Sequence, residues 1–232
     1  MNKDLNFSFG IVTNGENYKN IKKIIKSIKV QNIPNFEIII VGGSFEDAYK
    51  NKKIKHIPFD ETLKTGWITK KKNLIVDNSK YENIVFLHDY VYLENGWYKG
   101  YITFGSDFEI VTNKIKNMDS TRFRDWTLWN ADNQFKKNYL LPYWIKGLTS
   151  KMYISGTYWI AKKSFMLKFP LNEELIWGEG EDVEWSNRVK LKTSFKFNKH
   201  SSVKFLKQKR NDFVKIPYFQ LIKLLFKEKF FK

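Results

Sequence analysis

Residues 7–43 read FSFGIVTNGENYKNIKKIIKSIKVQNIPNFEIIIVGG, and they indicate the fold class of the chain more clearly than any other segment. The run from Phe7 to Thr13 is rich in β-branched and aromatic residues and is followed by the turn-like pair Asn14-Gly15. Isoleucines then recur at helical spacing across Tyr18 to Val30, with lysines opposite, before the continuous apolar run Phe36 to Val41. This order predicts strand, helix, strand.

The same alternation continues along the first half of the chain. We expect a short strand at Ile54 to Ile57, a helix across Thr69 to Val76, and a buried strand at Ile84 to Leu87. Alternating strands and helices favour an α/β fold with a mostly parallel central sheet flanked by helices. A chain of 232 residues fits a single domain with one sizeable core.

Composition limits the possible classes of protein. Apolar residues make up 42% of the chain, which argues against disorder despite a formal net charge of +17. The chain has no cysteine, which excludes disulfides, thiolate chemistry and cysteine-rich zinc sites. The first residues form no apolar signal segment, and no apolar run approaches the ~20 residues that span a bilayer. We therefore expect a cytoplasmic location, with at most peripheral membrane contact.

One acidic cluster stands out in this basic chain, Trp177-Gly178-Glu179-Gly180-Glu181-Asp182-Val183-Glu184-Trp185. Carboxylates beside glycines, which let a substrate approach the backbone closely, suit a site that abstracts a proton. A plainer interpretation is that acids in the first turn of a helix from about Glu181 to Lys190 complement its dipole, with Glu184 and Arg188 forming a pair. Both interpretations can hold together.

Polar residues follow the predicted strands at the edge where α/β sheets bind ligands. These strand ends carry Thr13-Asn14, Gly42-Gly43 and His88-Asp89-Tyr90. The third is the most informative, because it places an imidazole and a carboxylate together at one rim. Both groups are good ligands for a divalent cation.

Four short motifs occur in an order and at a spacing that resemble glycosyltransferases of the GT-A fold, in particular inverting family 2 and its relatives: Thr13-Asn14, Lys72-Asn73, His88-Asp89 and Gly180-Glu181-Asp182. The resemblance runs from about Phe7 to His200. It implies a GT-A catalytic domain over residues 1–211, with a nucleotide-sugar-binding half at 1–112 and an acceptor-binding half at 113–211. Residues 212–232 would form a separate basic amphipathic helix.

The resemblance implies an inverting transfer of a sugar from a nucleotide-diphosphate sugar, with UDP as the usual nucleotide, to a hydroxyl of a glycan or a lipid-linked acceptor. Polysaccharide biosynthesis is the matching context. Asp182 would be the general base, and Glu181 would support it by raising the proton affinity of the pair. The residues implied to bind the donor are Thr13 and Asn14 beside the nucleoside, Gly43 at the base, Lys72 facing the diphosphate, and His88.

The family usually carries Asp-x-Asp after its fourth strand, where the two acids hold a metal ion. This chain has His88-Asp89-Tyr90 there, so one carboxylate remains for Mn²⁺ or Mg²⁺, which prefer several oxygen ligands. Asp89 with His200, which follows a predicted short strand at Ser194 to Asn198, is the expected metal pair. Two alternatives stay open: ordinary partly buried histidines, and a cation-independent mechanism that uses Lys72.

The second half also carries candidates for acceptor binding. Asn117 to Lys151 is a long aromatic-rich connection without clear periodicity, of the kind that often forms a lid or binding segment. The residues that we expect at the acceptor are Trp126, Gly156, Trp177 and Gly178. For Trp126 the alternative is a purely structural core contact, and for Gly156 it is a strand bulge without a ligand.

The last segment, Pro217 to Lys232, reads as a basic amphipathic helix that either lies on an anionic membrane or packs on the core. Two other functions compete with sugar transfer. A non-enzymatic protein could bind nucleic acid or polyanions through its lysines, but that leaves the acidic cluster unexplained, and we expect no nucleic-acid partner. A nucleotidyltransferase would need a glycine-rich phosphate loop after the first strand, which Asn14-Gly15-Glu16 does not supply.

Overall fold

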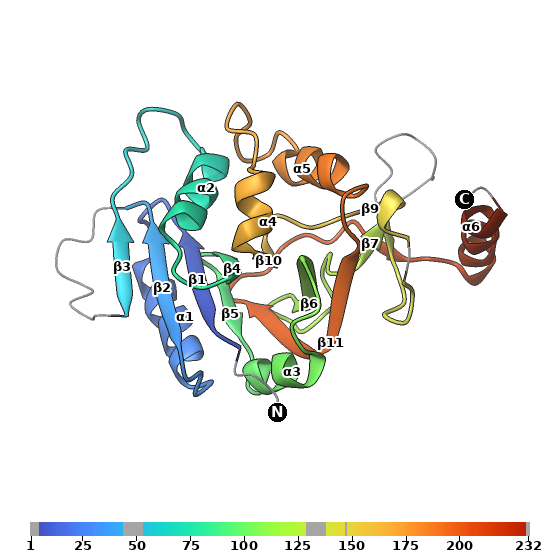
Figure 1. Cartoon of the computed structure of the whole chain (residues 1–232), viewed down its shortest axis with the longest axis horizontal. Coiled ribbons are helices and arrows are strands. Elements are labelled where there is room, and N and C mark those ends of the chain that lie inside the picture. Colours follow the sequence, from blue (N-terminus) through green and yellow to red (C-terminus); the bar gives the residue numbers. More distant parts are fainter. Residues whose placement is uncertain (1–4, 44–52, 129–137, 147, 231–232) are drawn as a thin grey trace.

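The computed structural model of the chain describes residues 5–43, 53–128, 138–146 and 148–230. The strands of its large sheet are β1 (Phe7–Val12), β2 (Phe36–Val41), β3 (Ile54–Ile57), β4 (Asn83–His88), β5 (Val91–Leu93), β6 (Ile110–Lys116), β10 (Tyr158–Lys162) and β11 (Phe195–Phe205). Within the described ranges these eight lie in the order β3-β2-β1-β4-β10-β6-β11-β5 (Figure 1).

A smaller sheet forms from short strands in the second half of the chain. These are β7 (Thr127–Leu128), β8 (Tyr139–Leu140), β9 (Met152–Tyr153) and β12 (Val214–Lys215). They pair in the order β12-β8-β7-β9. Two of them, β7 and β8, together with a turn of 3₁₀-helix at Thr149–Lys151, belong to the connection that the sequence left without regular structure, of which residues 129–137 and 147 lie outside the described part.

Helices cover both faces of the large sheet. The helices are α1 (Tyr18–Lys29), α2 (Ile68–Asn78), α3 (Trp97–Phe104), α4 (Lys163–Lys168), α5 (Glu181–Val189) and α6 (Tyr218–Phe230). Apolar residues of α1 and α3 join one buried cluster with alternate residues of β1, β2 and β4. Residues of α2, α4 and α5 join a second cluster on the opposite face. The layered α/β architecture that the sequence predicted is confirmed.

The first half of the sheet matches the sequence analysis closely. Each of its predicted strands and helices forms, and their ends differ from the expected ones by two residues or fewer. Strands β3, β2, β1 and β4 are all parallel to their neighbours. The second half is mixed, because β10 runs antiparallel to both β4 and β6, whereas β6 and β11 are parallel.

Strand β11 is longer than predicted. The expected strand at Ser194 to Asn198 continues to Phe205, with an irregularity in its pairing to β6 between Asn198 and Ser202. The Asn198 side chain bridges this bulge, since its Nδ2 donates to Ser201 Oγ at 2.9 Å and its Oδ1 accepts from the His200 N–H at 2.9 Å. His200 therefore lies inside the strand instead of after it.

Helix α6 lies at the opposite end of the molecule from β3 (Figure 1). Leu221 and Leu224 are buried in the second core cluster, so the helix packs on the core of its own domain, one of the two expected outcomes. Phe219 and Phe226 are 78% and 59% exposed. None of the helices described here is long and apolar enough to cross a membrane.

Close packing between β1 and α2 depends on Gly10. A Cβ at this position would lie 2.3 Å from Cγ2 of Ile75, well inside van der Waals contact. Gly10→Ala is expected to lower the free energy of unfolding by about 1–3 kcal/mol, because the methyl overfills a packed core layer. Urea denaturation of the wild type and the variant measures this difference.

Ile75→Ala supplies the control for this prediction, because it removes every atom that the new methyl would meet. In that background Gly10→Ala should cost little or even stabilise the fold. An equal cost in both backgrounds would contradict the proposed overlap.

Candidate active site

Two neighbouring cavities open at the edge of the sheet where β1 and β4 end. The acid cavity, of about 590 Å³, is lined by the acidic cluster, by residues 155–157 and by the segment around Lys209. The strand-end cavity, of about 560 Å³, is lined by residues that follow β1 and β4, by Glu61 and Lys71, and by Lys207 and Lys209. His88, Trp177 and Lys209 line both, so the two cavities adjoin.

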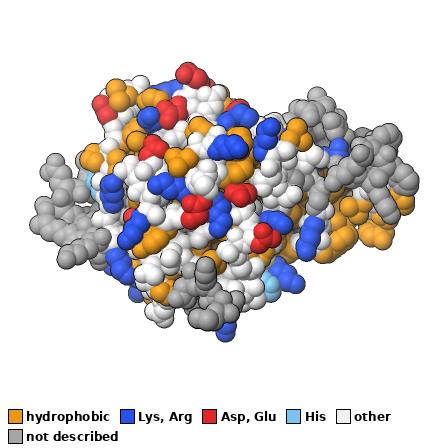
Figure 2. Space-filling model, in the orientation of Figure 1, with side chains coloured by type: hydrophobic (Ala, Val, Ile, Leu, Met, Phe, Trp, Pro, Cys, Tyr) orange, Lys and Arg blue, Asp and Glu red, His pale blue; other side chains and the backbone are white. Residues whose placement is uncertain are grey.

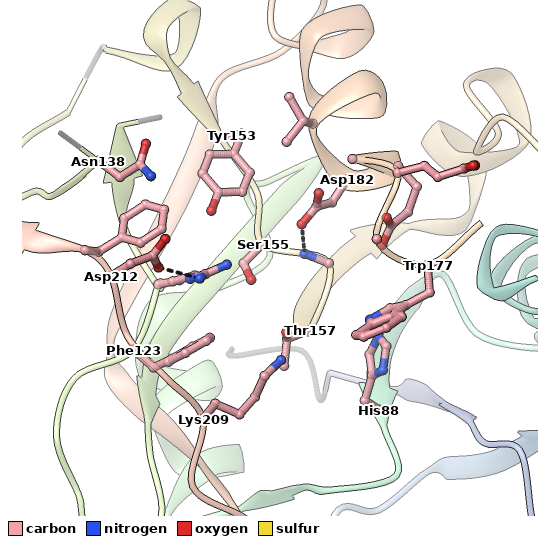
Figure 3. Close-up of a pocket in the computed structure, with 18 residues that line it drawn as sticks. His88, Phe123, Asn138, Tyr153, Ser155, Thr157, Trp177, Asp182, Lys209 and Asp212 are labelled. Atoms are coloured by element: carbon pink, nitrogen blue, oxygen red, sulfur yellow. Dashed lines mark hydrogen bonds and ion pairs between the residues drawn. The ribbon is translucent and has the colours of Figure 1, made fainter. Parts of the chain in front are cut away.

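Asp182 lies on the wall of the acid cavity. The chain enters α5 through Gly180, whose φ of +77° is a left-handed conformation that glycine adopts without strain, and Glu181 and Asp182 form the first turn of the helix. Asp182 is half-buried, and its Oδ2 accepts the Gly156 N–H at 2.7 Å (Figure 3). A carboxylate so fixed at a cavity wall suits proton transfer.

Gly156 leaves room for the two acids. A Cβ at Gly156 would lie 3.0 Å from Cβ of Asp182 and 3.3 Å from Oε1 of Glu181. The sequence predicted that Gly156 admits an acceptor closely. In the structure this glycine allows the two acids to lie close to the backbone, and it also lines the acid cavity. Its contact with an acceptor stays a prediction.

Lys72 lies beneath this acid pair. Its side chain is buried, and its Nζ donates to the Gly156 carbonyl at 2.9 Å. Burial lowers the pKa of Lys72, while the charges of Glu181 and Asp182 work in the opposite direction. Because Lys72 lines neither cavity, the expectation that it faces a diphosphate is corrected.

Glu181 is the more buried of the two acids. Burial raises the pKa of Glu181, the positive charge of Lys72 lowers it, and the charge of Asp182 raises it further. Glu181 also lines the acid cavity. Its supporting role stays a prediction.

The tryptophans on either side of the acidic cluster have different environments. Trp177 is 64% exposed and lines both cavities, and its N–H donates to the Gly66 carbonyl at 2.9 Å. Gly178, with a φ of +91°, lines the acid cavity next to it. Trp185 is buried, with its ring 4.6 Å from that of Trp159, so it belongs to the core.

Trp126 does not reach either cavity. Its side chain is 2% exposed, its indole N–H donates to the Ile145 carbonyl at 3.0 Å, and its ring packs 5.4 Å from that of Phe197. Neither cavity counts Trp126 among its lining residues. The predicted acceptor contact is corrected to the structural alternative, a core residue whose polar atom is satisfied internally.

The strand-end cavity brings together most of the predicted donor residues. Thr13 Oγ1 donates to Asp89 Oδ2 at 2.9 Å, and Asn17 Nδ2 donates to the same oxygen at 3.1 Å. Asn14 is exposed and lines this cavity, as does His88. The ends of β1 and β4 are therefore joined through Asp89.

Gly43 lies at the end of β2, where its carbonyl is 3.1 Å from His56 Nε2. It lines neither cavity. Its neighbour Gly42 has a φ of +105°, and a Cβ there would lie 1.9 Å from the Thr13 carbonyl oxygen. This pair of glycines lets the ends of β1 and β2 meet, and the predicted contact of Gly43 with a base is not supported by its position.

His88 lies at the border of the two cavities. Burial lowers the pKa of His88 well below its usual range, and the positive charges of Lys72, Lys209 and Lys207 lower it further. The charges of three lysines therefore act on one imidazole that lines both cavities.

The expected metal pair does not come together. His200 is exposed and lines neither cavity, and its carbonyl oxygen lies against α3, where a Cβ on Gly100 would be 2.5 Å from it. Asp89 lies in the strand-end cavity. The strand bulge at His200 and the cavity edge are separated by the rest of β11, so the prediction of an Asp89–His200 site is corrected.

Sequence reasoning missed two lysines of the site. Lys207 and Lys209 follow β11 and line the cavities, and Arg124 is paired with Asp212 on the wall of the acid cavity (Figure 3). Lysines are so frequent in this chain that neither position is distinctive in sequence. The basic triplet Lys207-Gln208-Lys209 after an apolar strand was the available signal.

No family model and no curated protein sequence matches the chain. Solved structures do match it. GalNAc-T7 with UDP, GalNAc and Mn²⁺ aligns at a TM-score of 0.63 with 13% identity, over 88% of this chain and 44% of that one. S. aureus TarS 1–349 in complex with UDP-GlcNAc aligns at 0.62 with 17% identity, over 90% of this chain and 60% of that one.

The same TarS fragment in complex with UDP aligns at a TM-score of 0.60 with 15% identity, over 97% of this chain and 65% of that one. This chain therefore spans less than two thirds of the length of each of these structures. Structural similarity at such low sequence identity shows a shared fold and nothing more. The chain has the GT-A fold that the sequence motifs predicted.

Proposed function

We propose that this chain is a glycosyltransferase that moves a sugar from a nucleotide-diphosphate sugar to a hydroxyl of a glycan or a lipid-linked acceptor. The observation that carries the proposal is the half-buried Asp182 carboxylate on the wall of one cavity, directly beside a second cavity at the ends of β1 and β4. An α/β sheet binds its ligands at this edge. The fold is the one found in glycosyltransferases.

The two cavities support separate binding sites for the donor and for the acceptor. The strand-end cavity, lined by Thr13, Asn14 and His88 among others, is the proposed donor site. The acid cavity, with Asp182, Trp177 and Gly178, is the proposed acceptor site. The division into a donor half at 1–112 and an acceptor half at 113–211 stays a prediction, since each cavity is lined by residues of both halves. UDP is the first nucleotide to test, because GalNAc-T7 and TarS were solved with UDP or UDP-GlcNAc.

The proposed reaction is a single displacement with inversion. Asp182 accepts the proton of the acceptor hydroxyl as that oxygen forms a bond to the anomeric carbon. The bond between the anomeric carbon and the diphosphate oxygen breaks at the same time, and the nucleoside diphosphate leaves with its electron pair. The Gly156 N–H holds Asp182 in place, while Glu181 and the buried Lys72 set the charge around it.

Trp177 provides an apolar surface at the junction of the two cavities. Its ring is exposed there, and exposed aromatic faces pack well against the apolar faces of pyranose rings. The sugar being transferred has to lie at this junction, because it is bound to the donor and attacked by the acceptor. Trp177 is therefore a proposed contact of the transferred sugar as well as of the acceptor, and Gly178 remains a proposed acceptor contact.

The sequence predicted Mn²⁺ or Mg²⁺ at Asp89, and the matched structure of GalNAc-T7 contains Mn²⁺. The residues present here do not fit such an ion. Asp89 Oδ2 already accepts from Thr13 and Asn17, and the partly exposed Glu61, another carboxylate of the cavity, is paired with Lys71. In the described part of the chain, no three His, Cys, Asp or Glu side chains are grouped to hold a metal. A hard cation prefers several oxygen ligands.

A panel of nucleotide sugars tests the proposal. We expect one nucleotide sugar, with UDP sugars first, to raise the melting temperature of the folded chain, because a ligand that binds the native state stabilises it by mass action. The anomeric configuration of the product, read by NMR, should be inverted relative to the donor. A retained configuration would contradict the single displacement.

The same panel separates the rival function. Strong salt-dependent binding of DNA, together with no response to any nucleotide sugar, would favour a polyanion-binding protein. On the face shown in Figure 2, lysine and arginine side chains are scattered among acidic ones and do not gather in one stripe. That distribution favours the enzyme.

Asp182→Asn is expected to reduce transfer about 100-fold or more, because an amide cannot accept the proton of the acceptor. Binding of the nucleoside diphosphate should persist. Initial rates and calorimetric titration measure the two effects.

Glu184→Gln is the matched control for this variant. Glu184 is also in the first turn of α5, but it pairs with Arg188 and lines neither cavity. Both substitutions change the helix dipole interaction equally. Similar losses of activity in the two variants would contradict a specific role for Asp182.

Contact with a membrane through residues 217–232 is a further expectation, because Phe219, Lys223 and Phe226 of α6 are exposed. Replacing both by serine should abolish co-sedimentation with phosphatidylglycerol vesicles. Leu191→Ser, at a position 79% exposed and far along the chain from α6, is the control. Unchanged sedimentation of the double variant would rule out this contact.

A further inference from the structure

Two ammonium groups gather around Tyr90, the residue after Asp89. Lys207 Nζ lies 4.1 Å from the centroid of the Tyr90 ring, and Lys209 Nζ donates to Tyr90 Oη at 3.1 Å. Both side chains line the strand-end cavity together with Asp89. A GT-A enzyme with a metal would hold that ion beside the residues that follow β4. Here two ammonium groups lie at that place, where the donor diphosphate would bind.

The fold fixes the segment that carries both lysines. Where β11 ends, the Leu206 N–H donates to the Tyr90 carbonyl at 2.8 Å. The buried side chain of Asn117 then holds the backbone of Lys209 on both sides, since its Oδ1 accepts the Lys209 N–H at 2.8 Å and its Nδ2 donates to the Lys209 carbonyl at 2.6 Å. The two lysines are therefore positioned by ordered backbone.

These charges have no counter-ion of their own. Among the described residues, neither ammonium group has a carboxylate within ion-pair distance. Burial and the charges of Lys207 and Arg124 lower the pKa of Lys209 to about 8, against the opposite effect of Asp182 and Glu181. Like charges held together at the wall of a cavity indicate an anion site.

We propose that Lys207 and Lys209 bind the donor diphosphate in the place of a divalent cation, so that transfer proceeds without a metal ion. This inference rests on the glycosyltransferase function proposed above. Lys209 lines both cavities and extends toward Thr157, between the strand ends and the Asp182 side (Figure 3). That is where the phosphate oxygen bound to the sugar has to lie.

The chemistry of the step agrees with this assignment. As the bond between the anomeric carbon and the phosphate oxygen breaks, negative charge grows on the departing diphosphate. Lysine ammonium groups bind phosphate as point charges, and preorganised positive charge near a leaving group lowers the barrier to its departure. No proton has to be transferred to the diphosphate, because the single proton released goes from the acceptor hydroxyl to Asp182.

Calorimetric titration of UDP and of uridine, both in EDTA, tests the inference, because the difference between the two affinities reports the contribution of the diphosphate. If a sugar of another nucleotide raises the melting temperature instead, the corresponding nucleoside diphosphate and nucleoside are titrated in place of UDP and uridine. We expect UDP to bind without metal, and Lys207→Met and Lys209→Met each to weaken UDP about tenfold, or 1.4 kcal/mol, while uridine binding is unchanged. Addition of MnCl₂ should not restore the loss.

Two further variants make the result specific. Lys209→Arg keeps the charge and should retain most of the affinity for UDP. Lys196→Met removes a charge from an exposed position of the same strand, β11, outside both cavities, and should have no effect. A loss of uridine binding in the Lys207 or Lys209 variants would show that they disturb the fold, and would overturn the assignment.

The possible failures are distinguishable. Binding of UDP that requires Mn²⁺, or that is unchanged in both lysine variants, overturns the inference and leaves the glycosyltransferase proposal standing. Absence of binding by every nucleoside diphosphate and nucleotide sugar, with and without Mn²⁺, overturns the proposed function itself.

Discussion

The buried ammonium group of Lys72 is the constraint on which the site depends. A charge removed from water is costly unless it is partnered and hydrogen-bonded. Lys72 donates to the Gly156 carbonyl and lies near Glu181 and Asp182, while the Gly156 N–H binds Asp182. These hydrogen bonds and charges join three elements, namely helix α2, the turn before β10 and the first turn of α5, in one electrostatic unit. This explains why a chain so rich in lysine keeps a compact acidic cluster.

The same unit accounts for the space around the acids. A Cβ at position 156 would crowd both carboxylates, at 3.0 Å from Asp182 Cβ and 3.3 Å from Glu181 Oε1, so glycine leaves them room beside the carbonyl that accepts from Lys72. Glu181 fills the buried side of the pair and Asp182 the cavity side. A base is more useful when its position is fixed before the substrate arrives, because no reorganisation is then needed during the reaction.

Local patterns predicted what depends on local sequence. The strands and helices of the first half, the start of α5 and the polar strand ends follow from periodicity and turn residues, and the structure confirms their places. Trp126 and His200 were misplaced because burial and strand register are set by distant partners: Phe197 covers Trp126, and a bulge keeps His200 inside β11. Lys207 and Lys209 could not be singled out among the many lysines of the chain, since only the pairing of β11 with β5 brings them beside Tyr90.

Charge placement connects the two cavities. Under the proposed function, a negatively charged base and a polyanionic donor must lie within reach of the same sugar, and their like charges repel. A positive group between them removes this conflict, and Lys209, which lines both cavities, has that position. In GT-A enzymes with Asp-x-Asp, the two carboxylates after the fourth strand would attract a cation to this edge of the sheet. With two lysines already there, a second carboxylate would neutralise the charge that the diphosphate needs, so the sequence His88-Asp89-Tyr90 and the basic segment after β11 are two parts of one arrangement.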